Sequence, residues 1–140
     1  MDMNRIRDTL VKHEGLRLDL YQDHLGIYTV GVGHNIQERG ISERVAYIML
    51  EEDIDVAVKD LQRNISYFDK LPECVQEALV NLSFNLGMPR LMSFKKTLAY
   101  LREGKWEKAA NELLDSRYAT QVGYRAVEVA AMIRGAADDA

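Results

Sequence analysis

The stretch LDLYQDHLGIYTVGV, residues 18–32, decides the fold. Its two ends, residues 18–21 and 27–32, alternate apolar and other side chains at the two-residue period of a β-strand. Both are rich in β-branched and aromatic residues, which favour strands. Asp23-His24-Leu25-Gly26 between them has the composition of a turn. The pattern therefore predicts a β-hairpin.

Most of the remaining chain has helical periodicity. Helices are predicted over residues 4–13, 43–63, 73–86, 93–103, 105–115 and 121–134. Ser42 is the expected N-cap of the longest helix, and Gly87 with Pro89 is expected to end the next one. We expect a mainly α protein with a small β-hairpin or sheet, an α+β arrangement of two lobes joined by one long helix.

The chain length of 140 residues fits a single domain. The small lobe is expected at residues 14–42, and the long helix at residues 43–63 joins it to the helical lobe. The helical lobe is expected to comprise residues 64–135 together with the N-terminal helix 4–13. A cleft between two lobes is where we expect a binding site.

The composition excludes several classes of protein. Hydrophobic residues make up 47% and charged residues 29%, which is typical of a globular protein. No apolar run approaches the roughly 18 residues of a membrane span, and the N-terminus lacks the apolar stretch of a secretory signal, so synthesis in the cytoplasm is expected. Cys74 is the single cysteine, and no two histidines have zinc-ligand spacing, so no metal site is expected.

The net charge of −4 is confined to residues 1–63, which hold 12 acidic and 8 basic residues. Domains that bind nucleic acids usually carry a basic stripe that neutralises phosphates. The acidic excess therefore argues against a helical DNA-binding domain, and no nucleic-acid partner is expected.

Two carboxylates and a hydroxyl lie on neighbouring elements of the predicted small lobe. Glu14 ends the first helix, Asp23 follows nine residues later at the turn, and Thr29 six residues after that in the second strand. Glycoside hydrolysis uses a pair of carboxylates, of which one protonates the leaving oxygen and the other supports attack by water. Taken alone, the pair can equally be solvated surface charge, and Asp23 can be a turn former.

The full string from Glu14 to His34 resembles the active-site segment of the bacteriophage-type lysozymes, glycoside hydrolase family 24, and especially their T-even phage endolysin branch. Its spacing of nine and six residues and its Thr-x-Gly-x-Gly-His strand match that branch. The resemblance continues in residues 52–58, 81–87, 106–110 and 116–118, and it covers nearly the whole chain. It implies the two-lobed fold that the periodicity indicates independently.

The resemblance also implies an activity and a mechanism. The expected enzyme is a muramidase that hydrolyses the β-1,4 bond between N-acetylmuramic acid and N-acetylglucosamine in peptidoglycan, with inversion and without a cofactor. Glu14 would be the general acid, Asp23 would orient or deprotonate the attacking water, and Thr29 would hold that water. An inverting enzyme needs roughly 6.5–9.5 Å between the two carboxyl groups.

Supporting residues follow from the same resemblance. Arg125 matches an arginine that approaches the catalytic glutamate from the large lobe, although it can also be a surface arginine. His34 is expected to pair with Asp53 in a structural rather than a catalytic role. Phe84 matches a residue that lines the cleft, with simple core packing as the alternative.

Other residues match positions that contact substrate or lie near the cleft. Thr97 matches a small hydroxyl residue that contacts substrate. Asn85, Arg117 and Tyr118 match positions near the cleft, and Tyr118 replaces the usual tryptophan of the family.

The chain also departs from the T-even branch. It is shorter between Asn35 and Ser42, where that branch has additional sheet and a helix, so one wall of the cleft should be reduced. Asn35 stands where that branch has an apolar residue, and Glu112 where it has an asparagine that binds substrate. The binding subsites are therefore expected to differ.

The sequence pI of about 5.4 is low beside the basic phage enzymes. Positive surface charge favours approach to an anionic cell wall, and this chain lacks an excess of it. We expect weak wall binding at low ionic strength, measured by co-sedimentation with purified walls. Binding that rises as salt is reduced would contradict this expectation.

Three functions are compatible with the residues. The first is an endolysin of a phage or prophage that acts as a monomer and is released to its peptidoglycan substrate through a separate, holin-like pore protein. The second is a lytic transglycosylase, but that route uses no water, and the presence of both Asp23 and Thr29 argues against it. The third is a peptidoglycan-binding module without catalytic activity.

Overall fold

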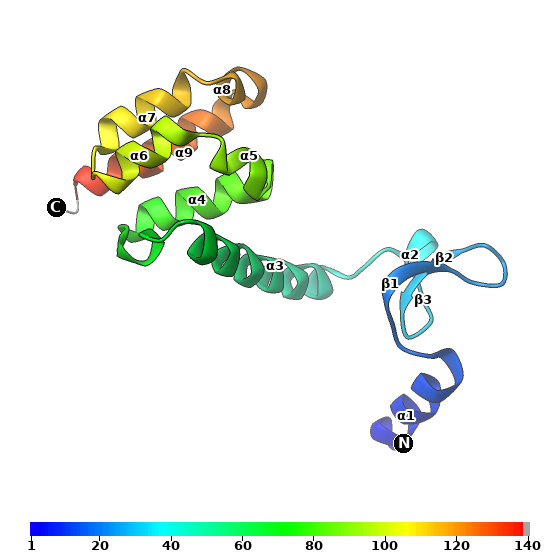
Figure 1. Ribbon diagram of the computed structural model, residues 1–140. Helices are drawn as coiled ribbons and strands as arrows, with labels where there is room; N and C mark the ends of the chain where they lie inside the picture. Colours follow the sequence, from blue (N-terminus) through cyan, green and yellow to red (C-terminus); the bar gives the residue numbers. More distant parts are fainter. Residues whose placement is uncertain (139–140) are drawn as a thin grey trace. The chain divides into compact units, whose positions relative to one another are not determined.

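The computed structural model describes residues 1–138. Its elements are α1 (Met3–Glu14), β1 (Arg17–Gln22), β2 (Tyr28–Gly31), β3 (His34–Asn35), α2 (Ile36–Arg39), α3 (Glu43–Asn64), η1 (Phe68–Lys70), α4 (Glu73–Leu86), α5 (Met88–Met92), α6 (Lys95–Arg102), α7 (Trp106–Leu114), α8 (Arg117–Val122), α9 (Tyr124–Arg134) and η2 (Gly135–Ala137). The protein is mainly α with a small antiparallel sheet, which confirms the predicted fold class (Figure 1).

Contacts within the chain divide it into two units, Met1–Met49 and Leu50–Ala140. The boundary between the units falls inside α3, the longest helix. Ser42 caps this helix as predicted, because its Oγ accepts a hydrogen bond from the backbone N–H of Val45 at 3.2 Å. The expected assignment of the N-terminal helix to the helical lobe stays a prediction.

The sheet of the first unit has the order β1-β2-β3, so the predicted hairpin is confirmed and extended by a short third strand. Thr29 on the central strand pairs with Tyr21 on β1 and with Asn35 on β3. Asn35 is also the N-cap of α2, because its Oδ1 accepts a hydrogen bond from the N–H of Glu38 at 3.0 Å. This capping role explains why residue 35 is polar here, although the T-even phage endolysin branch has an apolar residue at the matching position.

The hydrophobic core that the structure describes lies in the second unit. Its centre is formed by Leu79 of α4, Leu113 of α7 and Ile133 of α9, whose side chains are fully buried. Figure 1 shows α6, α7 and α9 packed side by side, and α4 contacts α9. The sequence of α4 is rich in apolar residues and suggests an almost fully buried helix, which is wrong, because Glu77 and Phe84 on its other face are exposed.

The predicted helices of the second unit needed two corrections. The helix predicted over residues 93–103 begins at Lys95, after a separate short helix, α5. The helix predicted over residues 121–134 begins at Tyr124, because Gly123 with φ of 60° ends α8 and cannot continue a right-handed helix. Helices of five or six residues are too short to show a clear amphipathic period.

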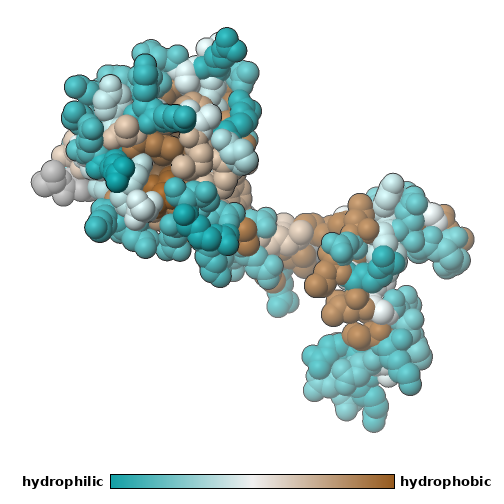
Figure 2. Space-filling model, in the orientation of Figure 1, coloured by the Kyte–Doolittle hydropathy of each residue, from teal (hydrophilic) through white to brown (hydrophobic). Residues whose placement is uncertain are grey.

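The first unit exposes much of its apolar surface. Figure 2 shows brown, apolar surface over this unit. Its exposed large apolar side chains include Leu18 and Leu20. Thr29 is the buried polar residue of the sheet, at 3% exposure. The first unit thus consists of a small sheet and short helices without a large hydrophobic core among its described residues.

Candidate active site

The predicted site residues are divided between the two units. Glu14, Asp23, Thr29 and His34 belong to the first unit. Asp53, Phe84, Asn85, Thr97, Arg117 and Arg125 belong to the second. Each group is therefore described within its own unit.

Glu14 is the last residue of α1, and its side chain is exposed. Gly15 ends the helix with φ of 79°, and its N–H donates to the carbonyl of Val11 at 2.8 Å. The carboxylate lies beside the turn between β2 and β3, at Gly33. The end of α1 and the turn between β2 and β3 thus meet at this carboxylate.

Asp23 follows β1 and shapes the turn to β2. Its Oδ1 accepts hydrogen bonds from the backbone N–H groups of Leu25 at 2.8 Å and Ile27 at 3.0 Å. These bonds, that from Ile27 above all, hold the pKa of the Asp23 carboxyl below its ordinary value. Oδ2 accepts no hydrogen bond from residues 1–138. Asp23 is therefore a turn former, as one interpretation predicted, and it keeps one ionised oxygen available.

Acid is expected to loosen this turn. Because the pKa of Asp23 is lower in the folded protein than its ordinary value of 3.8, the ionised group stabilises the fold above that value. The contribution is lost as the pH falls through the lower, folded value. Amide exchange at Leu25 and Ile27, corrected for intrinsic rates, should lose protection in this range before the rest of the first unit. The Asp23→Asn variant has no carboxyl group to titrate at this position. If its Leu25 and Ile27 amides lost the same protection over the same pH range, the loss could not be assigned to protonation of Asp23.

Thr29 has its hydroxyl fixed in one direction. Its Oγ1 donates to the carbonyl of Ile27 at 2.8 Å, and the side chain is buried. Because a hydroxyl has a single hydrogen, the remaining lone pairs of Oγ1 can only accept. Thr29 therefore offers an acceptor to a molecule, such as water, that reaches it.

His34 has a partner that sequence reasoning did not predict. Its Nε2 lies 2.6 Å from the carbonyl oxygen of Gly40, and because a carbonyl only accepts, Nε2 carries the proton. The ring also lines a cavity of about 510 Å³ with apolar side chains that include Ile36 and Val45. The expected pairing of His34 with Asp53 stays a prediction, because the two residues belong to different units.

Arg125 is held by a residue that the sequence analysis missed. Its Nε donates to Oδ1 of Asn81 at 2.9 Å, and its Nη2 donates to the carbonyl oxygen of Asn81 at 3.2 Å. Arg125 and Asn81 line a cavity of about 330 Å³ together with Phe84 and Glu77. Asn81 could have been noticed as a lone amide between Val80 and Leu82 in an apolar helical run, but its partner lies 44 residues away.

Phe84 does not pack in the core, which was the alternative interpretation. Its side chain is 44% exposed and borders two cavities. One is the cavity that it shares with Arg125, and the other, of about 300 Å³, is also lined by Asp53. Ligand-binding pockets commonly combine an aromatic side chain with a few hydrogen-bonding groups, as these cavities do.

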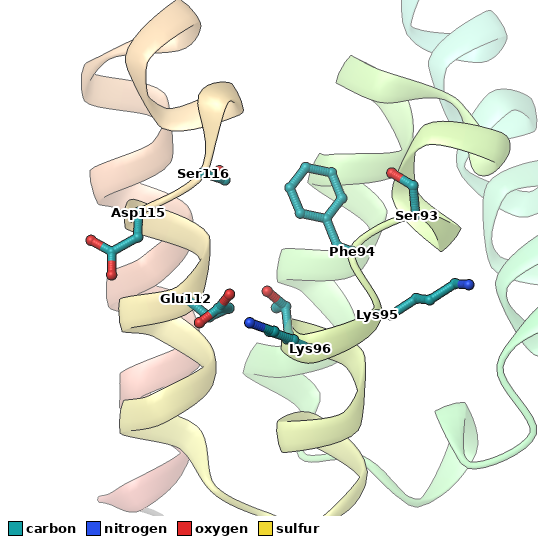
Figure 3. Close-up of a pocket in the computed structure, with 8 residues that line it drawn as sticks. Ser93, Phe94, Lys95, Lys96, Glu112, Asp115 and Ser116 are labelled. Carbon is teal, nitrogen blue, oxygen red and sulfur yellow. The ribbon is translucent and has the colours of Figure 1, made fainter.

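Thr97 lines a separate cavity of about 320 Å³ between α6 and α7. Figure 3 shows Lys96 of α6 and Glu112 of α7 pointing toward one another across this cavity. The Thr97 side chain is 3% exposed, and its Oγ1 has no hydrogen-bond partner among the described residues. The cavity thus has side chains of both charge signs on its wall, while the Thr97 hydroxyl is buried behind it.

Asn85, Tyr118 and Arg117 differ in their surroundings. Oδ1 of Asn85 and the hydroxyl of Tyr118 are buried without a hydrogen-bond partner within residues 1–138. Burial raises the pKa of Tyr118, and nearby Arg125 opposes that change. Its ring meets Phe94 edge to face, with 6.1 Å between centroids. Arg117, in contrast, is exposed at the start of α8.

The Tyr118→Phe substitution is expected to stabilise the protein. It removes a buried hydroxyl that lacks a partner but keeps the edge-to-face contact with Phe94. A gain of about 1 kcal/mol is expected, which corresponds to a rise in Tm of about 3 °C. Tyr124→Phe, at an exposed tyrosine, is the matched control and should leave Tm unchanged. A lower Tm for Tyr118→Phe would show that this hydroxyl is satisfied, for instance by an internal water.

Within residues 1–138 no group of three His, Cys, Asp or Glu side chains is arranged to hold a metal ion. No helix in the same part of the chain is long and apolar enough to span a membrane.

Comparison with known proteins supplies the family. Residues 11–134 match the phage lysozyme family. The chain is 27% identical to probable T4-type lysozyme 1 of Dictyostelium discoideum, with 94% of each chain covered. It is 29% identical to the pre-baseplate central spike protein Gp5 of Enterobacteria phage T4, over 90% of this chain and 27% of that protein. It is 31% identical to an endolysin of Bacillus phage B103, over 81% of this chain and 45% of that protein.

The fold, a mainly α protein with a carboxylate-bearing small sheet, is that of a lysozyme-type glycoside hydrolase. The chain belongs to the phage lysozyme family. It is related to the T4-type lysozymes, and its activity is that of a lysozyme-like muramidase with peptidoglycan as the substrate.

Proposed function

We propose that this protein hydrolyses the β-1,4 bond between N-acetylmuramic acid and N-acetylglucosamine with inversion, using Glu14 as the general acid and Asp23 with Thr29 to position water. The observation that carries this assignment is the pair of hydrogen bonds that Oδ1 of Asp23 accepts from the backbone N–H groups of Leu25 and Ile27, since these bonds favour the ionised carboxylate and lower its pKa. An ionised carboxylate can take a proton from water but cannot supply one to a leaving group. Glu14, the other carboxyl of the pair, is assigned the role of the acid.

The hydrogen bonds of Asp23 and Thr29 support the proposed path of the water. Oδ1 of Asp23 is occupied by two backbone N–H groups, so Oδ2 accepts the proton of the attacking water. Thr29 donates its own hydrogen to Ile27, so Oγ1 accepts the second hydrogen of that water. The lone pair of the water oxygen then points at the anomeric carbon. Glu14 protonates the glycosidic oxygen as the bond to that carbon breaks.

The supporting residues are part of the same proposal. Asn81 holds the guanidinium of Arg125 in a fixed orientation, which fits a group that acts electrostatically on bound substrate or on the acid. Phe84, Asn85, Thr97 and Arg117 are assigned to sugar or peptide contacts in the second unit. His34 is assigned a structural role, with Asp53 as its proposed additional partner.

The biological setting is proposed from the similarity to an endolysin. We assign the protein to a phage or prophage that lyses its bacterial host. It acts as a monomer, needs no cofactor, and reaches the wall from the cytoplasm through a separate pore-forming protein. Wall lysis from within should therefore require co-expression of such a pore protein.

Mass spectrometry of the products tests the reaction. Purified peptidoglycan is digested with the protein and, in parallel, with the Glu14→Gln variant. Reducing N-acetylmuramic ends formed only by the parent protein support the proposal, and a freshly formed α-anomer in NMR spectra supports inversion. Anhydro-muramic ends would identify a lytic transglycosylase instead. The absence of products from both proteins would identify a binding module.

A further inference from the structure

Two glycines with left-handed backbones lie at the junction of β2 and β3, one at the end of β2 and one in the turn that follows. Gly31 has φ of 71° and Gly33 has φ of 61°, with Val32 between them. A left-handed φ disfavours any residue with a Cβ atom, so both positions carry the same kind of backbone constraint. Backbone conformation alone therefore does not distinguish the two glycines.

The space around the two glycines differs sharply. A Cβ atom at Gly31 would meet no atom within 4 Å. A Cβ atom at Gly33 would lie 2.8 Å from Oε2 of Glu14, 3.1 Å from its Cδ and 3.2 Å from its Cγ. The end of the Glu14 side chain thus rests on the bare Cα of Gly33, and this contact lies wholly within the first unit.

We propose that Gly33 is a positioning residue for the reaction, because the missing side chain at this position is what lets the Glu14 carboxylate occupy its place against the sheet. The inference rests on the proposed role of Glu14 as the acid. Gly33 touches neither substrate nor the reacting bond in this assignment. It acts only through the location of the Glu14 carboxyl group.

The effect on stability and the effect on catalysis should separate. Glu14 is an exposed side chain with free torsions, so it can swing away from a new methyl group at little cost to the fold. Catalysis is less tolerant, because a displacement of about 1 Å in a reacting group can cost about 100-fold in rate. A methyl group at residue 33 therefore moves the acid without unfolding the protein.

The test compares Gly33→Ala with Gly31→Ala in the full chain. Soluble, uncrosslinked glycan strands serve as substrate, and kcat, KM and Tm are measured for each variant. Both variants should lose similar thermal stability, because each places alanine at a left-handed φ. Gly33→Ala should lower kcat at least about 10-fold with KM nearly unchanged, and Gly31→Ala should lower kcat less than about twofold.

Other results overturn the inference. Equal loss of kcat in the two variants, or an unchanged kcat for Gly33→Ala, would show that the space beside Glu14 is not used for catalysis. If either alanine variant fails to fold, the pair Gly33→Asn and Gly31→Asn replaces it, because asparagine tolerates the left-handed region. The same criteria then apply to that pair.

Failure of the proposed function is recognised separately. A Glu14→Gln variant that keeps full activity would overturn the role of Glu14 itself. An inactive Glu14→Gln variant together with equal kcat values for the two glycine variants would overturn only the role of Gly33.

Discussion

Replacing Glu14 with glutamine is expected to lower the rate of wall lysis at least about 1,000-fold, since general acid catalysis contributes about 100- to 10,000-fold and no other carboxyl group is proposed to replace this acid. Glutamine keeps the size and shape of the side chain beside Gly33. The variant should therefore retain the local geometry but lack the proton. Wall turbidity and the release of reducing ends measure the loss.

The stability of this variant should change in the opposite direction. Glu14 is the last residue of α1, where a negative charge is unfavourable for the helix dipole. Its removal should raise the free energy of unfolding by about 0.3–1 kcal/mol. Glu128→Gln, at an exposed position on α9, is the matched control and should retain full activity. A Glu14→Gln variant that loses activity and unfolds at a lower temperature would point to a structural role instead.

Asp23 is expected to show two separable effects, because its carboxylate both shapes a turn and is proposed to receive a proton. Asp23→Asn keeps an Oδ1 that accepts from Leu25 and Ile27, so the turn should persist. The amide cannot act as a base, so lysis should fall about 100- to 10,000-fold. Asp23→Ala removes the acceptor as well, and it should lower both activity and Tm.

A comparison of the two Asp23 variants gives the decisive result. If Asp23→Asn retains most of the activity while Asp23→Ala loses it, Asp23 serves only as a turn former. Asp19→Asn, on the exposed strand β1, is the control for a change of charge close to the site. Full activity is expected for this control.

The sequence was sufficient to predict the elements whose patterns are local. The alternation in residues 18–32 predicted the hairpin, and Gly87 predicted the end of α4. The segment after the hairpin was harder, because α2 depends on a side-chain cap at Asn35 and has only four residues. The break at Gly123 was missed because the apolar period continues on both sides of it.

The contacts that support the candidate site could not be predicted from the sequence. Spacing and resemblance proposed Glu14, Asp23 and Thr29 as catalytic residues, and that assignment stays a prediction. The two hydrogen bonds between Asn81 and Arg125 join residues far apart in the sequence, so no local pattern indicates them. The close approach of Glu14 to Gly33 likewise depends on how α1 and the sheet are packed.

The bond between His34 and Gly40 bears on how the chain tolerates insertions. This hydrogen bond closes the segment from His34 to Gly40, which contains α2 and its N-cap Asn35. Extra residues placed after Gly40 would therefore lengthen a loop that begins beyond this closed segment, and the pairing of Thr29 with Asn35 need not change. Because doubling the length of a flexible loop costs only about 0.6 kcal/mol, this junction is a suitable place to graft a longer wall onto the small sheet and so to alter substrate range.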